Sequence, residues 1–215
     1  MAPPEDESRT DLDIRVRPAT ADRWPDLVDL FQRPGPRGGK SVASGCWCMF
    51  WRRDRKEFWA GWGRGERRGE GNRAELKQLV RSAEPPGLLA YDDEQAIGWL
   101  ALAPREDYPL LDRHRNLPRV DDRSVWSISC FYIHWAHHGR GVGEALVRGA
   151  CDYAARNAIT LLEAYPSRPG DEDPFTGFES MFEANGFRRV FDEGGRRSIW
   201  RREIEVSSRR LGRRR

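Results

Sequence analysis

Three glycines alternate with other residues in the segment His138-Gly-Arg-Gly-Val-Gly143. Glycine adopts positive φ easily, and because it has no Cβ it lets a ligand approach the main chain. An apolar run over residues 125–133 predicts a strand before the segment, and an apolar stripe over residues 142–157 predicts a helix after it. The N–H groups of such a loop, with the N-terminus of the helix, form a site for an anion, most naturally a diphosphate.

Two common diphosphate motifs do not match this segment. A dinucleotide fingerprint has a glycine where the chain has Glu144, and no earlier strand-loop-helix unit leads into it. The full Walker pattern, which is Gly, four residues, Gly-Lys and then Ser or Thr, does not occur in the chain. A glycine-rich turn that only links the strand to the helix stays open as an alternative.

The segment resembles the signature of the GCN5-related N-acetyltransferases, which is Arg or Gln, two residues, Gly, one residue, and then Gly or Ala. The later segment Phe182-Glu-Ala-Asn-Gly-Phe187 is similar to a second motif of that family, a helix that ends in Gly-Phe. The resemblance covers roughly residues 14–205 in the order of elements. A Cys-Trp-Cys-Met stretch at residues 46–49 also resembles a little-characterised subgroup.

The resemblance implies acetyl-CoA, or another short acyl-CoA, as the cofactor. Its pyrophosphate would lie on main-chain N–H groups of the loop, and the end of the preceding strand would bind the pantetheine arm through its backbone. His138 replaces the family's Arg or Gln, and an imidazole there predicts pH-sensitive phosphate binding. The residues expected to bind the cofactor are Phe131, Ile133, His138, Gly139, Arg140, Gly141, Val142 and Gly143.

The implied chemistry is direct transfer of the acyl group from sulfur to an amine. The amine must lose a proton before it attacks, and the departing thiolate needs a proton donor. Many relatives have a tyrosine where this chain has Phe182 and a glutamate where it has Ser127. Substitutes of suitable type, each with an ordinary structural alternative, are Glu163 (a paired carboxylate), Tyr165 (a packed ring) and Cys130 (a small buried hydrophobe).

An aromatic patch falls where this family builds its acceptor side, between the first helix and the second strand. Trp47 and Trp51 belong to it, and Trp99 lies on a predicted strand nearby. We expect these three residues to bind the acceptor, which would then have an apolar or planar body. The alternative is that the rings only pack the first helices onto the sheet.

The composition fits one domain that can fold on its own core. The chain has 215 residues, 38% apolar and 33% charged, with four cysteines. No apolar run approaches the length of a membrane span, and the acidic start lacks the regions of a signal peptide. We therefore expect a cytoplasmic protein with reduced thiols. Cys46-x-Cys48 has the wrong spacing for a zinc knuckle, so no metal is predicted, although Cys130 with a histidine stays open.

The charge distribution argues against nucleic acid as a partner. Residues 1–13 are rich in acid and predict a disordered leader, and residues 206–215 hold five arginines without an acid and predict a flexible tail. The sequence pI of 8.8 therefore reflects the tail rather than a basic face. The expected partner is a small-molecule amine, with no membrane; a homodimer, acylation of a protein amine or hydroxyl, and a non-catalytic acyl-CoA sensor stay open.

The remaining elements position these residues. Residues 14–17 and 24–31 predict a strand and an amphipathic helix, residues 61–71 a mobile segment, and Asn72 with Glu75 the capping box of another helix. Further strands are expected at 87–91, 96–103, 160–165, 187–192 and 197–203, with a short helix near residues 178–182. The expected fold is α/β (α+β): a mixed, mostly antiparallel sheet of about six to seven strands flanked by helices, within residues 14–205.

Overall fold

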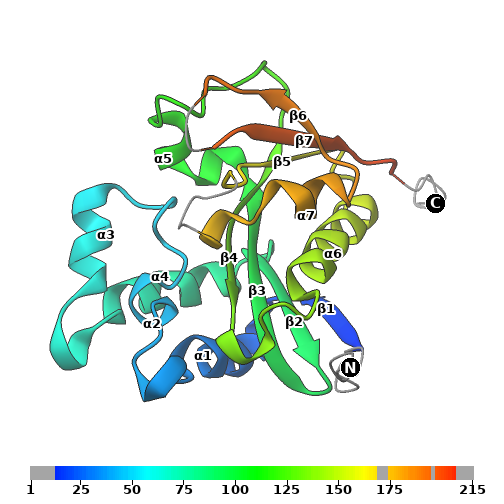
Figure 1. Ribbon diagram of the computed structural model, residues 1–215. Coiled ribbons are helices and arrows are strands. Elements are labelled where there is room, and N and C mark those ends of the chain that lie inside the picture. Colours follow the sequence, from blue (N-terminus) through cyan, green and yellow to red (C-terminus); the bar gives the residue numbers. More distant parts are fainter. Residues whose placement is uncertain (1–12, 169–173, 195–196, 207–215) are drawn as a thin grey trace, which may run out of the picture.

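A seven-stranded sheet in the order β1-β2-β3-β4-β5-β7-β6 forms the centre of the protein in a computed structural model (Figure 1). The structure describes residues 13–168, 174–194 and 197–206. Neighbouring strands are antiparallel except β4 and β5. This confirms the expected fold class. The predicted leader and tail lie outside the described residues, except for residues 13 and 206.

Most strands lie where the alternating and apolar runs predict them. The strands are β1 (Ile14–Pro18), β2 (Gly87–Asp92), β3 (Gln95–Pro104), β4 (Trp126–Ile133), β5 (Leu161–Ala164), β6 (Arg188–Phe191) and β7 (Ile199–Glu203). The helices are α1 (Trp24–Gln32), α2 (Ala43–Cys46), α3 (Arg55–Trp62), α4 (Glu70–Val80), α5 (Pro109–Asp112), α6 (Val142–Arg156) and α7 (Glu179–Glu183).

The two faces of the sheet carry separate cores. Strand β2 shows the reason, because its side chains alternate between the faces. Leu88 and Ala90 pack with the apolar stripe of α6 and with α7, whereas Leu89 and Tyr91 pack with α1 and α4. Figure 1 shows α6 and α7 on one side of the sheet and α1–α4 on the other. Strand β4 lies in the middle of this arrangement, between β3 and β5.

The segment before β2 differs from its prediction. Helix α3 ends at Trp62 and α4 begins at Glu70, so the segment predicted at 61–71 is mainly the connection between two helices, with a short helical turn at Gly65–Arg67; its mobility stays a prediction. The predicted capping box is wrong, because α4 begins at Glu70 after Gly69, whose φ is +80°, and Asn72 lies inside the helix. The Asn72 side chain is fully buried and its Nδ2 donates to the carbonyl of Gly45 at 2.9 Å. Its amide therefore joins α4 to α2.

Two features are absent from the described residues. No helix among them is long and apolar enough to cross a membrane. Within the same part of the chain, no three His, Cys, Asp or Glu side chains lie in a group that could hold a metal ion.

Candidate functional site

The loop between β4 and α6 is open at its glycines. Gly139 has φ +70° and Gly141, the N-cap of α6, has φ +75°. A Cβ built on either residue would meet no heavy atom within 4 Å. Glycine is therefore required here by the backbone conformation rather than by crowding. The exposed main chain of the loop leads directly into the first turn of the 15-residue helix α6, whose N–H groups have no partner within the helix. This arrangement fits the predicted diphosphate site.

Gly143, the third glycine of the segment, lacks the positive φ of the other two, and its place among the cofactor-binding residues stays a prediction. It lies inside α6. A Cβ there would lie 2.6 Å from Sδ of Met181, which is in the segment of α7. The missing side chain thus leaves room for the side chain of Met181 against the first turn of α6.

Two histidines around this loop contact main-chain carbonyl oxygens. The Nε2 atom of His138 lies 2.9 Å from the carbonyl oxygen of Ile133, the residue predicted to bind the pantetheine arm. On the other side, Nε2 of His134 and Nε1 of Trp135 lie 3.0 Å and 3.2 Å from the carbonyl oxygen of Pro34. The loop after α1 is thereby attached to the end of β4.

Strand β4 separates from β5 after a short stretch of pairing. The two strands pair at Trp126, Ser127 and Ile128 only, whereas β4 continues to Ile133. On the other edge of β4, the pairing with β3 skips Ser129, so β4 has a bulge at this residue. Beyond this point the short helical turn Pro174–Thr176 lies near β4. The second half of β4 therefore borders a place where the sheet opens.

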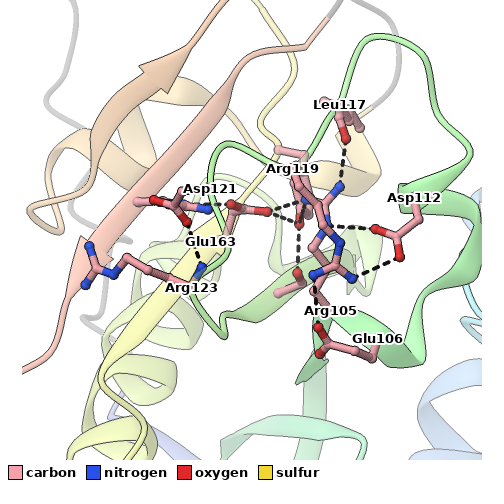
Figure 2. A network of polar contacts seen from close by, with 11 residues as sticks. Arg105, Glu106, Asp112, Leu117, Arg119, Asp121, Arg123 and Glu163 are labelled. Atoms are coloured by element: carbon pink, nitrogen blue, oxygen red, sulfur yellow. Dashed lines mark hydrogen bonds and ion pairs between the residues drawn. The ribbon is translucent and has the colours of Figure 1, made fainter.

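An ion-pair network joins β5 to β7 and to the connection after β3, next to the point where β4 and β5 separate (Figure 2). The Glu163 carboxylate on β5 is fully buried. Its Oε1 pairs with Nη1 of Arg105, and its Oε2 accepts a hydrogen bond from Nε of Arg201 at 2.7 Å. Figure 2 shows that further acids, among them Asp112 and Asp121, extend the network outward. The buried charge is thus paired on both oxygens.

Tyr165 connects the same network to β4. Its hydroxyl donates to Oε1 of Glu163 at 2.6 Å and lies 2.7 Å from Oγ of Ser127. Burial, together with the neighbouring carboxylate, raises the pKa of Tyr165 well above its ordinary value. The phenol therefore stays protonated and acts as a hydrogen-bond link across β4 and β5.

A cavity of about 220 Å³ lies beside the second half of β4. Two of the three predicted acceptor residues, Trp51 and Trp99, line it, and so does Cys130. Trp47 is not among the lining residues, because it packs in the core with ring centroids 5.4 Å from Phe31 and 5.8 Å from Trp24. The lining residues are Phe31, Val42, Ala43, Cys46, Cys48, Phe50, Trp51, Phe58, Trp59, Trp62, Trp99, Cys130, Phe131, Tyr132, Phe175, Thr176 and Arg197.

Three of the four cysteines line this cavity, and two of their thiols differ in acidity. A hydrogen bond from Cys130 lowers the pKa of Cys48, against the opposing effect of burial. Burial raises the pKa of Cys46 to about 12. The cavity wall therefore carries one acidified thiol next to one that stays protonated.

A sequence model of the acetyltransferase (GNAT) family matches residues 24–170. The match covers the loop, the divergent strands and most of the cavity wall. The chain belongs to the GNAT acetyltransferase family. As a GNAT acetyltransferase it uses acetyl-CoA as its cofactor. No curated protein sequence matches the chain.

Solved structures share the fold of this GNAT acetyltransferase at low sequence identity. The PaiA N-acetyltransferase from Thermoplasma acidophilum in complex with coenzyme A has a TM-score of 0.50 at 14% identity, covering 90% of this chain and 100% of that one. The GNAT domain of S. lividans PAT has a TM-score of 0.51 at 17% identity, over 89% and 90% of the two chains. A mosquito arylalkylamine N-acetyltransferase like 5b has a TM-score of 0.52 at 11% identity, over 89% and 100%.

The predicted catalytic residues of this GNAT acetyltransferase divide between two places. Cys130 lies at the cavity, whereas Glu163 and Tyr165 lie in the buried network. The contacts of Glu163 and Tyr165 favour a structural role, in which Glu163 is a paired carboxylate and Tyr165 is a packed phenol. Their catalytic role stays a prediction.

Sequence reasoning missed several residues of the site. Arg105 is buried and neutralises Glu163, but it follows β3 in a charged connection that gives no sign of burial. Phe175 and Thr176 line the cavity from a segment without apolar periodicity. Cys46 and Cys48 gave a signal of a buried position in the sequence, because free cysteine is among the most buried residue types.

Proposed function

We propose that this GNAT acetyltransferase transfers the acetyl group of acetyl-CoA to a primary amine of a small molecule, by direct attack within a ternary complex. One observation carries the proposal: the cavity borders Cys130, Phe131 and Tyr132, on the part of β4 that has separated from β5. A cofactor that lies along β4 and an acceptor in the cavity would meet at this part of the strand. A volume of about 220 Å³ suits a small acceptor better than a protein surface.

The open loop would hold the cofactor. The pyrophosphate would lie on the N–H groups of residues 139–143, which include the left-handed Gly139 and Gly141 and the start of α6. The pantetheine arm would follow the backbone of Phe131 and Ile133. Because His138 already contacts the Ile133 carbonyl, its imidazole would move aside when the arm binds.

The reaction exchanges a thioester for an amide and moves one proton. The amine lone pair attacks the thioester carbon, the new N–C bond forms, the C–S bond breaks, and one proton passes from nitrogen to the thiolate. Cys130, at the cavity wall, is the candidate relay: its thiol would protonate the leaving thiolate and would regain a proton from the amine nitrogen. Holding both reactants in line on a rigid strand supplies much of the remaining rate.

A thiol-release assay with a panel of small amines tests the proposal. Release of coenzyme A with formation of the acetylated amine is the expected result. Tight acetyl-CoA binding without turnover on any amine would instead favour a sensor, which the replacement of the usual Tyr and Glu by Phe182 and Ser127 also supports.

Gly141→Asp tests the cofactor loop. An aspartate there puts a negative charge where the diphosphate would lie, so acetyl-CoA affinity should fall by more than about tenfold. Gly194→Asp is the matched control, because Gly194 has φ +78° and open surroundings like Gly141 but lies in the turn between β6 and β7. Equal affinities of the two variants, measured by calorimetry, would contradict the placement.

A further inference from the structure

Aromatic rings in fixed orientations form most of the cavity wall. Phe58 packs at right angles to Phe50, with centroids 5.4 Å apart, and lies 5.6 Å from Trp62. On the β4 side, Phe31 packs edge-on against Tyr132 at 5.6 Å and against Trp99 at 5.9 Å. Edge-to-face pairs hold rings rigidly. The cavity is therefore a preformed, flat-walled space for a small apolar body.

The charges around this wall are positive. Among the described residues that line the cavity, none is an Asp or Glu, and Arg197 is the single permanently charged side chain. Its guanidinium lies over the ring of Trp51 at 5.7 Å, and its Nε donates to Thr176 at 3.3 Å. A second guanidinium, that of Arg68, lies over Trp62 at 5.1 Å. Two of the tryptophan rings thus already pack against cations.

An alkylammonium ion is poorly suited to such a space. Entering an apolar cavity removes its hydration, and no carboxylate among the described lining residues offsets that loss. The guanidinium groups add like-charge repulsion and already use cation–π contacts of the wall. The remaining titratable groups that line the cavity are three thiols and the phenol of Tyr132. The most acidic of these thiols, Cys48, is 7% exposed and is already engaged by the thiol of Cys130, so it offers an ammonium ion no free counter-charge.

We infer that the acceptor enters this cavity as an uncharged amine on a flat ring, that is, as an aromatic amine rather than an alkylammonium ion. This inference rests on the proposed function. It also explains the lack of a usual base: Ser127 stands at the family's glutamate position, and Glu163 is paired with two arginines. A neutral amine attacks without prior deprotonation. The cavity admits only the neutral form, so no base is needed to remove a proton from an ammonium ion.

Binding of a charged and an uncharged isostere tests the inference without turnover. Phenyltrimethylammonium and tert-butylbenzene have the same shape and differ in charge, and quenching of tryptophan fluorescence reports their binding in the presence of acetyl-CoA. The uncharged probe should bind at least about tenfold more tightly, corresponding to about 1.4 kcal/mol. Equal or tighter binding of the cation would overturn the inference and indicate an aromatic cage for ammonium ions.

A charge inserted at the rim should reverse the preference. Val42 lines the cavity and is 40% exposed, so Val42→Glu leaves the core intact. The cation should bind about tenfold more tightly to Val42→Glu than to the isosteric control Val42→Gln. Unchanged affinity for the cation in the glutamate variant, with acetyl-CoA binding retained, would show that the cavity does not receive the probe and would overturn the inference.

The pH dependence of turnover gives a second readout. With benzylamine, kcat/KM should rise about tenfold per pH unit up to the pKa of the free amine, whereas with aniline it should stay level from pH 6 to 8. A level profile for benzylamine would overturn the inference, because it would show that the protonated amine is bound and deprotonated by the enzyme. Absence of acetyl-CoA binding, in contrast, would remove the proposed function itself.

Discussion

Cys46 and Cys48 lie two positions apart in the cavity wall, and they provide an internal comparison of reactivity. Cys46 is the more exposed of the two, but its pKa is about 12, whereas a hydrogen bond from Cys130 lowers the pKa of Cys48. Because the thiolate is the nucleophile, we expect iodoacetamide at pH 8 to alkylate Cys48 first. Peptide mass spectrometry measures the two rates. Faster labelling of Cys46 would mean that access rather than acidity controls reactivity.

Glu163 allows a structural and a catalytic role to be separated. Its buried carboxylate pairs with Arg105 and Arg201, so Glu163→Gln should lower the free energy of unfolding by about 3 kcal/mol. We expect kcat of the folded enzyme to stay near that of the wild type. Urea unfolding and steady-state kinetics measure the two effects. A base would give the opposite pattern, with nearly unchanged stability and kcat reduced about a hundredfold or more.

Helix α6 depends on close approach to the sheet at Gly149. A Cβ there would lie 2.4 Å from Cγ1 of Val16 on β1. Alanine in a helix normally stabilises by up to about 1 kcal/mol relative to glycine, but overpacking costs about 1–3 kcal/mol. Gly149→Ala should therefore lower the free energy of unfolding by about 1 kcal/mol or more, as measured by urea denaturation.

Gly143 of the same helix is the control for this prediction. The atom nearest its added Cβ is Sδ of Met181, which belongs to a flexible side chain that can turn away. Gly143→Ala should therefore not lower the free energy of unfolding. If both variants lost the same stability, the effect would come from the helix and not from its contact with β1.

Acid sensitivity of the whole fold should depend on ion pairs that join distant segments. Asp121, in the connection before β4, accepts a hydrogen bond from Nη1 of Arg201 on β7 at 2.7 Å, which lowers the pKa of Asp121. A lowered folded-state pKa stabilises the fold fully above the ordinary aspartate pKa, and this contribution disappears as pH falls toward the lowered value. Asp121→Asn should therefore destabilise the protein at pH 6, and the difference should shrink toward pH 3.

Urea midpoints of the two proteins across this pH range measure the effect. A constant difference between them would show that the substitution acts through something other than the charge of Asp121. Asp54→Asn is unsuitable as a control, because its Oδ1 caps α3 by accepting from the N–H of Glu57. Asp152 is a better control, because it is 68% exposed and its contact with Arg156 is long, at 4.0 Å. Asp152→Asn should change the urea midpoint little at any pH.

Local patterns in the chain were sufficient for the regular elements and for the conformation of the glycine loop before α6. Alternation and helical periodicity depend on the nearest few residues, which is why β1, β4 and α6 lie where they were predicted. Gly139 and Gly141 mark the loop for the same reason, since their positive φ is a local requirement. The positive φ expected at Gly143 and the capping role expected at Asn72 are wrong, because both residues lie inside helices and contact neighbouring helices.

Contacts between distant residues decide the chemistry of the site, and no local pattern encodes them. Arg105 and Glu163 are 58 positions apart, and only the fold shows that a promising carboxylate is already neutralised. The cavity combines Phe31, Trp99 and Arg197, which three separate parts of the chain supply. Which rings line the cavity, and that the permanent charge among them is positive, follow from packing, because burial and pairing are properties of the assembled chain.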